Sequence, residues 1–161
     1  MKNRVLLIES ERATREKLSR KLERQNYDVR CAAHGQDALH NADLRQTDLL
    51  LIDLDVPADE SQGILSRIEE LNPVLQVVGL TERTDLPAAA LNARVSALME
   101  KPIDAAELLR VIEELLGQPP NDRPRVRLVR RGAKNLHDNL RPRRARPNFY
   151  PAPYSGWGIN E

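Results

Sequence analysis

The sequence predicts an α/β fold: a three-layer sandwich in which helices cover both faces of a parallel β-sheet. Short apolar runs alternate five times with longer segments whose apolar residues follow helical spacing. The runs at 4–8 and 48–52 are almost wholly apolar, which is typical of interior strands of a parallel sheet. We expect right-handed crossover connections between such strands.

Five segments are predicted as strands, and the second differs from the others. The strand segments are residues 4–8, 27–31, 48–52, 74–78 and 95–99. In the second, Tyr27, Val29 and Cys31 alternate with charged residues, which indicates a strand near the sheet edge with these three side chains on one face. Cys31 is therefore expected to be a small core residue.

Five helices are predicted between and after these strands, at residues 12–25, 35–42, 61–71, 86–93 and 105–116. The last has an apolar stripe of period 3.6, made by Leu108, Val111, Ile112, Leu115 and Leu116. Asp104 is suited to cap its N-terminus, and Gly117 is suited to a left-handed turn after its C-terminus.

Charge and composition divide the chain near residue 117. Residues 1–116 hold 15 basic and 21 acidic residues, a net charge of −6, whereas residues 117–161 hold 10 and 3, a net charge of +7. Seven of the eleven prolines also follow Gly117. We therefore expect one folded domain over 1–117 and a basic, Pro/Arg-rich tail over 118–161 that is disordered. A chain of 161 residues is too short for two domains of usual size, which argues against a two-domain enzyme.

The tail has no helix-turn-helix pattern, and three functional interpretations of it remain open. Its arginines and the aromatic residues after position 148 suit an arm that binds nucleic acid or an acidic protein. They also suit an aromatic-proline peptide that docks on a partner. A third interpretation is that the basic tail folds onto the acidic domain of its own chain.

Other features of the sequence concern the cell compartment. The one cysteine excludes intramolecular disulfides, and the apolar run before Glu9 is too short for a signal peptide. No apolar run approaches the ~18 residues of a membrane span. We expect a cytoplasmic protein without a membrane span.

Polar residues follow four of the predicted strands. The carboxyl ends of parallel strands lie at the same edge of a sheet, so we expect these residues to lie near one another. The first strand is followed by Glu9, Ser10 and Glu11, the third by Asp53, Leu54 and Asp55, the fourth by Thr81, and the fifth by Lys101. Ligands of open α/β sheets bind at this edge. The sequence contains no glycine-rich phosphate loop, no HExxH pattern and no GxSxG pattern.

Four segments together resemble the receiver domain of response regulators, and the resemblance covers residues 3–116. They are residues 5–11, residues 48–53 continuing to Val56 and Pro57, residues 80–81, and residues 99–103. The resemblance implies a flavodoxin-like, five-stranded parallel sheet of order 2-1-3-4-5. It also implies a single-domain response regulator with the basic tail appended.

The resemblance assigns roles to five residues. Asp53 would accept a phosphoryl group from the phosphohistidine of a sensor histidine kinase or phosphotransfer protein. Glu9, Asp53 and the backbone carbonyl of Asp55 would hold Mg²⁺. Lys101 would contact Asp53 and a phosphoryl oxygen, and Thr81 would hydrogen-bond another. Such a protein is a phosphoacceptor rather than an enzyme, and its output is contact with a downstream protein.

Ser10, Glu82 and Leu98 are among the positions that depart from the family pattern. Ser10 stands where receivers usually have a second acid, so weaker Mg²⁺ binding is expected. Glu82 would crowd the phosphoryl site, and Leu98 replaces an aromatic residue that often turns inward. Two alternatives follow: a pseudo-receiver interaction module that does not depend on phosphorylation, and a nucleic-acid binder driven by the tail. The resemblance further implies a cis peptide bond between Lys101 and Pro102.

Overall fold

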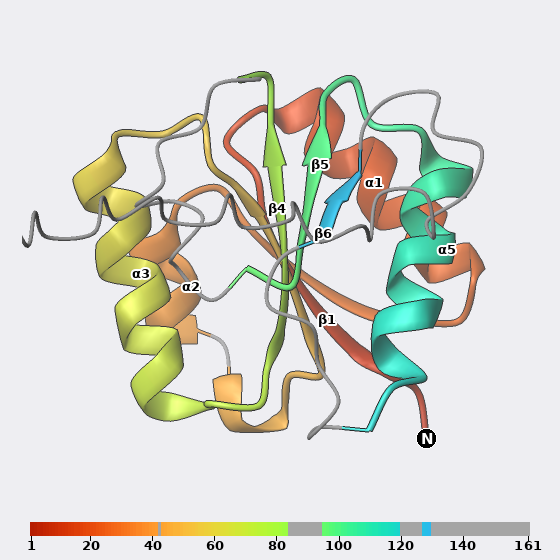
Figure 1. The fold of residues 1–161 in the computed structure, drawn as a ribbon, viewed down its shortest axis with the longest axis horizontal. Coiled ribbons are helices and arrows are strands. Elements are labelled where there is room, and N and C mark those ends of the chain that lie inside the picture. The colour runs from red at the N-terminus through yellow and green to blue at the C-terminus, as the bar shows by residue number, and fades with distance from the viewer. Residues whose placement is uncertain (42, 84–94, 120–126, 130–161) are drawn as a thin grey trace, which may run out of the picture.

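A six-stranded parallel sheet lies at the centre of the protein, seen in a computed structural model that describes residues 1–41, 43–83, 95–119 and 127–129 (Figure 1). The elements in chain order are β1 (Arg4–Ile8), α1 (Arg12–Arg24), β2 (Asp28–Ala32), α2 (Gly35–Asn41), the 3-10 helix η1 (Leu44–Gln46), β3 (Leu49–Asp53), α3 (Ala58–Leu71), β4 (Gln76–Thr81), β5 (Ala97–Glu100), α5 (Ala105–Leu116) and β6 (Arg127–Val129). The strand order is β2-β1-β3-β4-β5-β6, and every neighbouring pair is parallel. The predicted order of the first five strands is confirmed.

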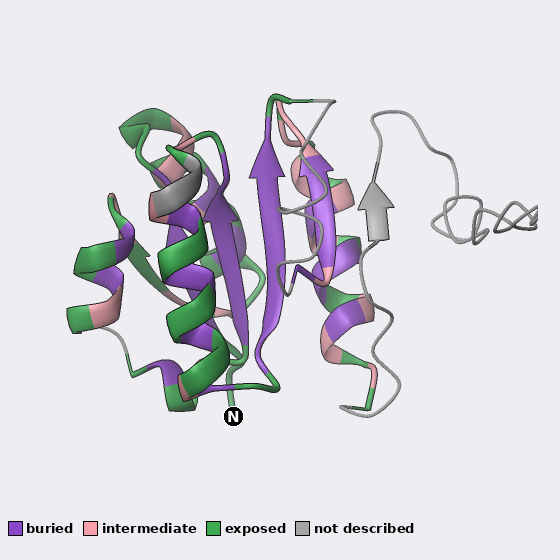
Figure 2. Cartoon of the chain, turned by 60° about the vertical axis from the view of Figure 1, so that its left-hand side comes forward, coloured by how far each residue is buried: buried purple, intermediate pink, exposed green. Residues whose placement is uncertain are grey.

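Helices cover both faces of the sheet, as the prediction of a three-layer sandwich requires. Helices α1 and α5 lie on one face and α2 and α3 on the other (Figure 1). Along β3, Leu49 and Leu51 pack in the cluster that contains α1 and α5, whereas Leu50 and Ile52 pack in the cluster that contains α3. Because successive residues of a strand point to opposite faces, one apolar run fills both cores. The buried strands lie between exposed helix surfaces in Figure 2.

Several element bounds differ from the sequence prediction. β3, β4 and β5 end at Asp53, Thr81 and Glu100, later than predicted, because parallel pairing continues into the polar residues: Asp53 pairs with Leu80, and Thr81 pairs with Glu100. Helix α3 begins at residue 58, three residues before the predicted start. The predicted helix at 86–93 lies outside the described residues.

Two local predictions were wrong. Cys31 is exposed, although Tyr27 and Val29 pack against the core. Its strand β2 is at the sheet edge and is covered less completely than the interior strands. Gly117 has φ −76° and ψ −10°, a right-handed conformation, because its N–H continues the helical pattern to the carbonyl of Glu113. The Asp104 cap is confirmed by hydrogen bonds from the N–H groups of Ala106 and Glu107.

The sixth strand is a feature that the sequence analysis did not predict. Residues 127–129, within the predicted tail, pair in parallel with β5, with Leu128 opposite Leu98 (Figure 1). The edge of β5 that would otherwise be open is thereby covered by backbone of the same chain. The remaining tail, residues 120–126 and 130–161, lies outside the described residues. Within the described part of the chain, no helix is long and apolar enough to cross a membrane.

We expect the substitution Leu128→Pro to weaken the pairing of β6 with β5, because proline removes a backbone N–H and fits poorly into a strand. Loss of one net backbone hydrogen bond, about 1 kcal/mol, should speed hydrogen exchange of the β5 amides that face β6 about fivefold. The β5 amides that face β4 are the internal reference. Equal exchange in both proteins would show that β6 does not protect β5.

Candidate functional site

The ends of four strands bring the predicted site residues to one edge of the sheet. Asp53 and Thr81 are the last residues of β3 and β4, while Glu9 and Lys101 directly follow β1 and β5. The Lys101 N–H donates to the Thr81 carbonyl (2.7 Å), which extends the pairing of β4 and β5 by one residue. The expected meeting of these side chains is confirmed.

The ammonium group of Lys101 lies at the centre of this site. Its Nζ is 2.9 Å from Asp53 Oδ1, 3.3 Å from Asp55 Oδ2 and 3.4 Å from Glu9 Oε2. Burial lowers the pKa of Lys101, but the hydrogen bond to Asp53 and the charges of Asp53, Glu9 and Asp55 outweigh burial, so the net pKa is raised above its ordinary value. Lys101 is therefore a fixed positive charge shared by three carboxylates. The Lys101–Pro102 peptide bond is cis, as the resemblance implied.

The two carboxylate oxygens of Asp53 have different surroundings. Oδ1 accepts hydrogen bonds from Lys101 Nζ and from the backbone N–H of Asp55, both at 2.9 Å. Oδ2 faces the hydroxyl of Ser10, which donates at 3.4 Å. The residue is only 5% exposed. Oδ2 is therefore the less strongly held oxygen.

Glu9 is the most deeply buried acid of the site. It is 1% exposed, and Oε1 accepts a hydrogen bond from the Glu11 N–H (3.0 Å). Oε2 is buried and accepts no hydrogen bond from the residues that the structure describes. Burial is the main reason that the pKa of Glu9 is raised, and the nearby charge of Asp53 raises it further. Arg15 fixes the surrounding loop, because its Nη1 donates to the carbonyl oxygens of Glu9 (2.7 Å) and Ser10 (3.2 Å).

Asp55 binds the loop that follows β4, a contact that the sequence analysis missed. Thr81 Oγ1 donates to Asp55 Oδ1 (2.7 Å), and the Glu82 N–H donates to both carboxylate oxygens (3.1 and 2.9 Å). The Arg83 N–H in turn donates to Thr81 Oγ1 (3.0 Å). The position of Asp55 at the same sheet edge as Thr81 was the available signal, but it does not specify the direction of a side chain.

The three residues named above as departures from the family pattern lie in two different parts of the domain. Ser10 and Glu82 are exposed at the rim of the site. Leu98, by contrast, is buried in the core on the α2 and α3 face. An added Cβ on neighbouring Gly79 would lie 3.0 Å from Leu98 Cδ1 and 2.5 Å from Leu54 Cδ1. A larger residue at position 79 would therefore have to displace the terminal methyl groups of these two leucines.

The residues fit a weak metal site better than a strong one. Within the described part of the chain, no group of three His, Cys, Asp or Glu side chains has a spacing that could hold a metal ion. Glu9 Oε2, which Lys101 Nζ approaches at 3.4 Å, and the neighbouring Asp53 carboxylate are nevertheless hard oxygen donors of the kind that Mg²⁺ prefers. Two carboxylates and a backbone carbonyl would be completed by water.

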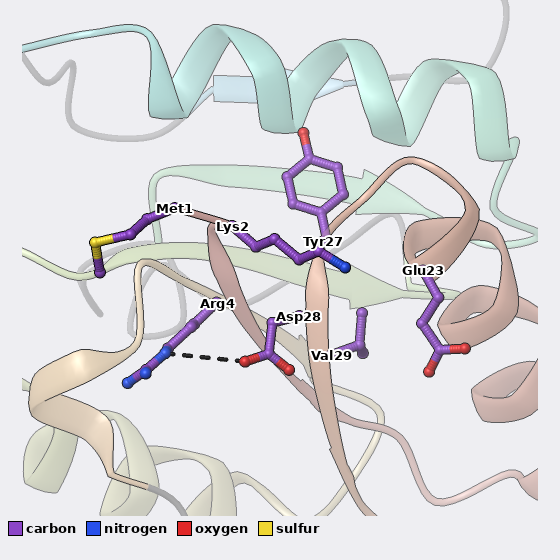
Figure 3. Close-up of a pocket in the computed structure, with 7 residues that line it drawn as sticks. All are labelled: Met1, Lys2, Arg4, Glu23, Tyr27, Asp28 and Val29. Atoms are coloured by element: carbon purple, nitrogen blue, oxygen red, sulfur yellow. Dashed lines mark ion pairs between the residues drawn. The ribbon is translucent and has the colours of Figure 1, made fainter.

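The pocket in Figure 3 lies away from these residues, around the beginnings of β1 and β2. Its volume is about 410 Å³, and it is lined by Met1, Lys2, Arg4, Glu23, Tyr27, Asp28 and Val29. Arg4 and Asp28 form an ion pair across it at 3.9 Å. Because it shares no residue with the acidic site, it does not contribute to the chemistry at the carboxyl edge.

A parallel sheet of this order, with Asp53, Thr81 and Lys101 at its carboxyl edge, defines a receiver-type signalling domain. The chain belongs to the response regulator receiver domain family, whose model matches residues 5–113. Members of this family act in two-component systems, interact with histidine kinases or phosphotransfer proteins, and generally bind Mg²⁺ at the phosphorylation site.

Curated relatives include two regulatory proteins. The tetrathionate response regulatory protein TtrR of Salmonella typhimurium is 32% identical over 97 residues, which cover 59% of this chain and 47% of that protein. The transcriptional regulatory protein PdtaR of Mycobacterium tuberculosis is 30% identical over 113 residues, which cover 68% of this chain and 55% of that protein. The chain thus spans about half of the length of these two relatives.

Solved structures match over the receiver region. A CheY-like receiver domain protein from Methanospirillum hungatei JF-1 is 26% identical with a TM-score of 0.65, and the match covers 73% of this chain and 95% of that one. The signal receiver domain of an HD domain-containing protein from Pseudomonas fluorescens Pf-5 is 26% identical with a TM-score of 0.66, covering 73% and 96%.

Proposed function

We propose that Asp53 accepts a phosphoryl group from the phosphohistidine of a sensor histidine kinase or phosphotransfer protein. The observation that carries this proposal is the 2.9 Å contact between Lys101 Nζ and Asp53 Oδ1 at an edge that also holds Thr81. A carboxylate attacks phosphorus slowly unless nearby groups neutralise the charge on the transferring oxygens. Lys101 supplies that charge.

Asp53 Oδ2 is the oxygen that we expect to attack. Lys101 and the Asp55 N–H hold Oδ1 at 2.9 Å, whereas the hydrogen bond that Oδ2 accepts from Ser10 is longer, at 3.4 Å. The new O–P bond forms as the P–N bond of the phosphohistidine breaks. The electron pair of the P–N bond stays on the ring nitrogen, and the ring, which already carries a proton on its other nitrogen, leaves as neutral imidazole. Lys101 and Thr81 then have donors for two of the phosphoryl oxygens.

Glu9, Asp53 and the backbone carbonyl of Asp55 would hold Mg²⁺, which when bound supplies positive charge for the phosphoryl oxygens. Binding should be weak, since Ser10 contributes no charge where a second acid is usual. Receiver domains are generally not classical enzymes, and we propose that this one assists only its own phosphorylation and dephosphorylation.

The output is proposed to be contact with a downstream protein. The named relatives are regulatory proteins, but this chain spans only about half of their length, so their activities do not transfer to it directly. Nucleic-acid binding is the alternative, because the basic tail has nine arginines after residue 118 that can bind the phosphate groups of DNA or RNA. Salt-dependent retention on DNA or RNA that disappears when residues 118–161 are removed would favour this alternative.

Phosphorylation of Asp53 can be tested by incubating the full chain with Mg²⁺ and acetyl phosphate and measuring its intact mass. We expect a gain of one phosphoryl group that is lost in Asp53→Asn. Asp48→Asn is the matched control, because Asp48 is an exposed carboxylate directly before the other end of the same strand. It should be modified like the unaltered protein.

Two results would contradict the proposal. A phosphoryl group still gained by Asp53→Asn would place the modification on another residue. No gain in the unaltered chain would favour the pseudo-receiver alternative, in which the fold serves as an interaction module.

A further inference from the structure

We propose that the Asp55 carboxylate occupies the position of the phosphoryl group in the unphosphorylated protein and must leave before Asp53 can be phosphorylated. The inference deepens the proposed function and rests on it. Three donors of different kinds converge on this one side chain: the Thr81 hydroxyl, the Glu82 N–H and the Lys101 ammonium.

These donors match what a phosphoryl group would need. Two of them, Thr81 and Lys101, are the residues expected to hold phosphoryl oxygens. The third is a backbone N–H, a group that commonly binds anionic oxygens. Glu82 N lies 3.1 and 2.9 Å from the two oxygens of Asp55, and Thr81 Oγ1 lies 2.7 Å from one of them. A carboxylate thus already occupies the donors that an entering phosphoryl group would use.

The same donors cannot hold both anions. A phosphoryl group on Asp53 would also place its negative charge beside the Asp55 carboxylate, and like charges repel. The Asp55 side chain is 22% exposed, compared with 6% for Asp53, so it has access to solvent on leaving. The site is therefore closed by its own residue, and only the fraction of molecules with Asp55 displaced is ready for phosphorylation.

Asp55→Ala removes the carboxylate that accepts from these three donors, and it keeps the backbone carbonyl that is proposed as a metal ligand. We expect phosphorylation by acetyl phosphate to become about 10 to 100 times faster, the range that corresponds to losing hydrogen bonds to a charged group. Asp55→Asn keeps an acceptor of the same shape without the charge, so its rate should lie between those of Asp55→Ala and the unaltered chain. It also serves if the alanine variant does not fold.

The matched control is Glu82→Gln. It removes one negative charge from the same rim and leaves Asp55 on its donors, because only the backbone of Glu82 makes that contact. An exposed charge acts through a field that salt screens, so any gain in this variant should be small and should vanish at high ionic strength. The gain in Asp55→Ala should persist there.

A second measurement does not depend on phosphorylation. In Asp55→Ala, titration with sulfate should shift the NMR signals of the Glu82 and Arg83 amides, and in the unaltered chain it should not. Equal sulfate shifts in both proteins, or an Asp55→Ala rate no higher than that of Glu82→Gln, would overturn the proposal while Asp53 remains the phosphoacceptor. If no variant is phosphorylated, the proposed function fails and the sulfate titration decides alone whether Asp55 covers an anion site.

Discussion

Replacing Lys101 with methionine is expected to lower the free energy of unfolding by about 3 kcal/mol at neutral pH and the melting temperature by about 10 °C. Methionine keeps most of the length of the side chain but removes the ammonium group that lies within 3.4 Å of Glu9, Asp53 and Asp55. Loss of one partner leaves buried carboxylates without a counter-charge, which is more costly than loss of an exposed ion pair.

This loss should depend on pH in a direction set by Glu9. Burial raises the pKa of Glu9 above its ordinary value of 4.5, and removal of Lys101 raises it further. An acid whose pKa is higher in the folded state than in the unfolded state destabilises the fold as the pH rises from its unfolded-state pKa through its folded-state pKa. The difference in free energy of unfolding between Lys101→Met and the unaltered chain should therefore become smaller as the pH falls toward 4.5.

The raised pKa of Lys101 itself affects stability at alkaline pH. The stabilisation that its charge provides is fully present below the ordinary lysine value of 10.5 and is lost only as the pH rises through the higher folded value. Denaturant unfolding at several pH values measures both effects. Lys17→Met, on the exposed surface of α1, is the control and should change little at any pH. A Lys101→Met protein as stable as this control at neutral pH would refute the role given to Lys101.

The second large effect is expected from restoring an acid at Ser10. The Ser10 hydroxyl lies 3.4 Å from Asp53 Oδ2, so an aspartate there would place its carboxylate beside the oxygen proposed to attack phosphorus. Ser10→Asp should tighten Mg²⁺ binding by about 1–3 kcal/mol, or roughly 5- to 150-fold, after desolvation is subtracted from the charge attraction.

Calorimetric titration with Mg²⁺ measures this change directly. Ser10→Asn is the matched control, because asparagine has the size of aspartate without its charge, and its affinity should stay near that of the unaltered chain. Without Mg²⁺ the added carboxylate should destabilise the fold, since it repels Asp53. Equal Mg²⁺ affinities in the two variants would show that the charge missing at Ser10 does not limit metal binding.

Much of the candidate site could be predicted because it follows from topology. The sequence places Asp53, Thr81 and Lys101 after predicted strands, and parallel strands bring their carboxyl ends to one edge. No knowledge of side-chain conformation is needed for that step. Which oxygen of Asp53 is held by Lys101, and where the Asp55 carboxylate points, depend on rotamers and loop paths that a linear pattern does not contain.

The sequence by itself determined the α/β class, the order along the chain of strands β1 to β5 and of helices α1, α2, α3 and α5, and the residues at the carboxyl edge. It could do so because apolar periodicity and strand polarity are local properties. Only the tertiary structure decided that β6 covers the edge of β5, that Cys31 is exposed, and that the Asp55 carboxylate accepts hydrogen bonds from the Thr81 hydroxyl and the Glu82 N–H. Each of these depends on which groups far apart in the chain come within contact distance, and that is settled by packing of the whole domain.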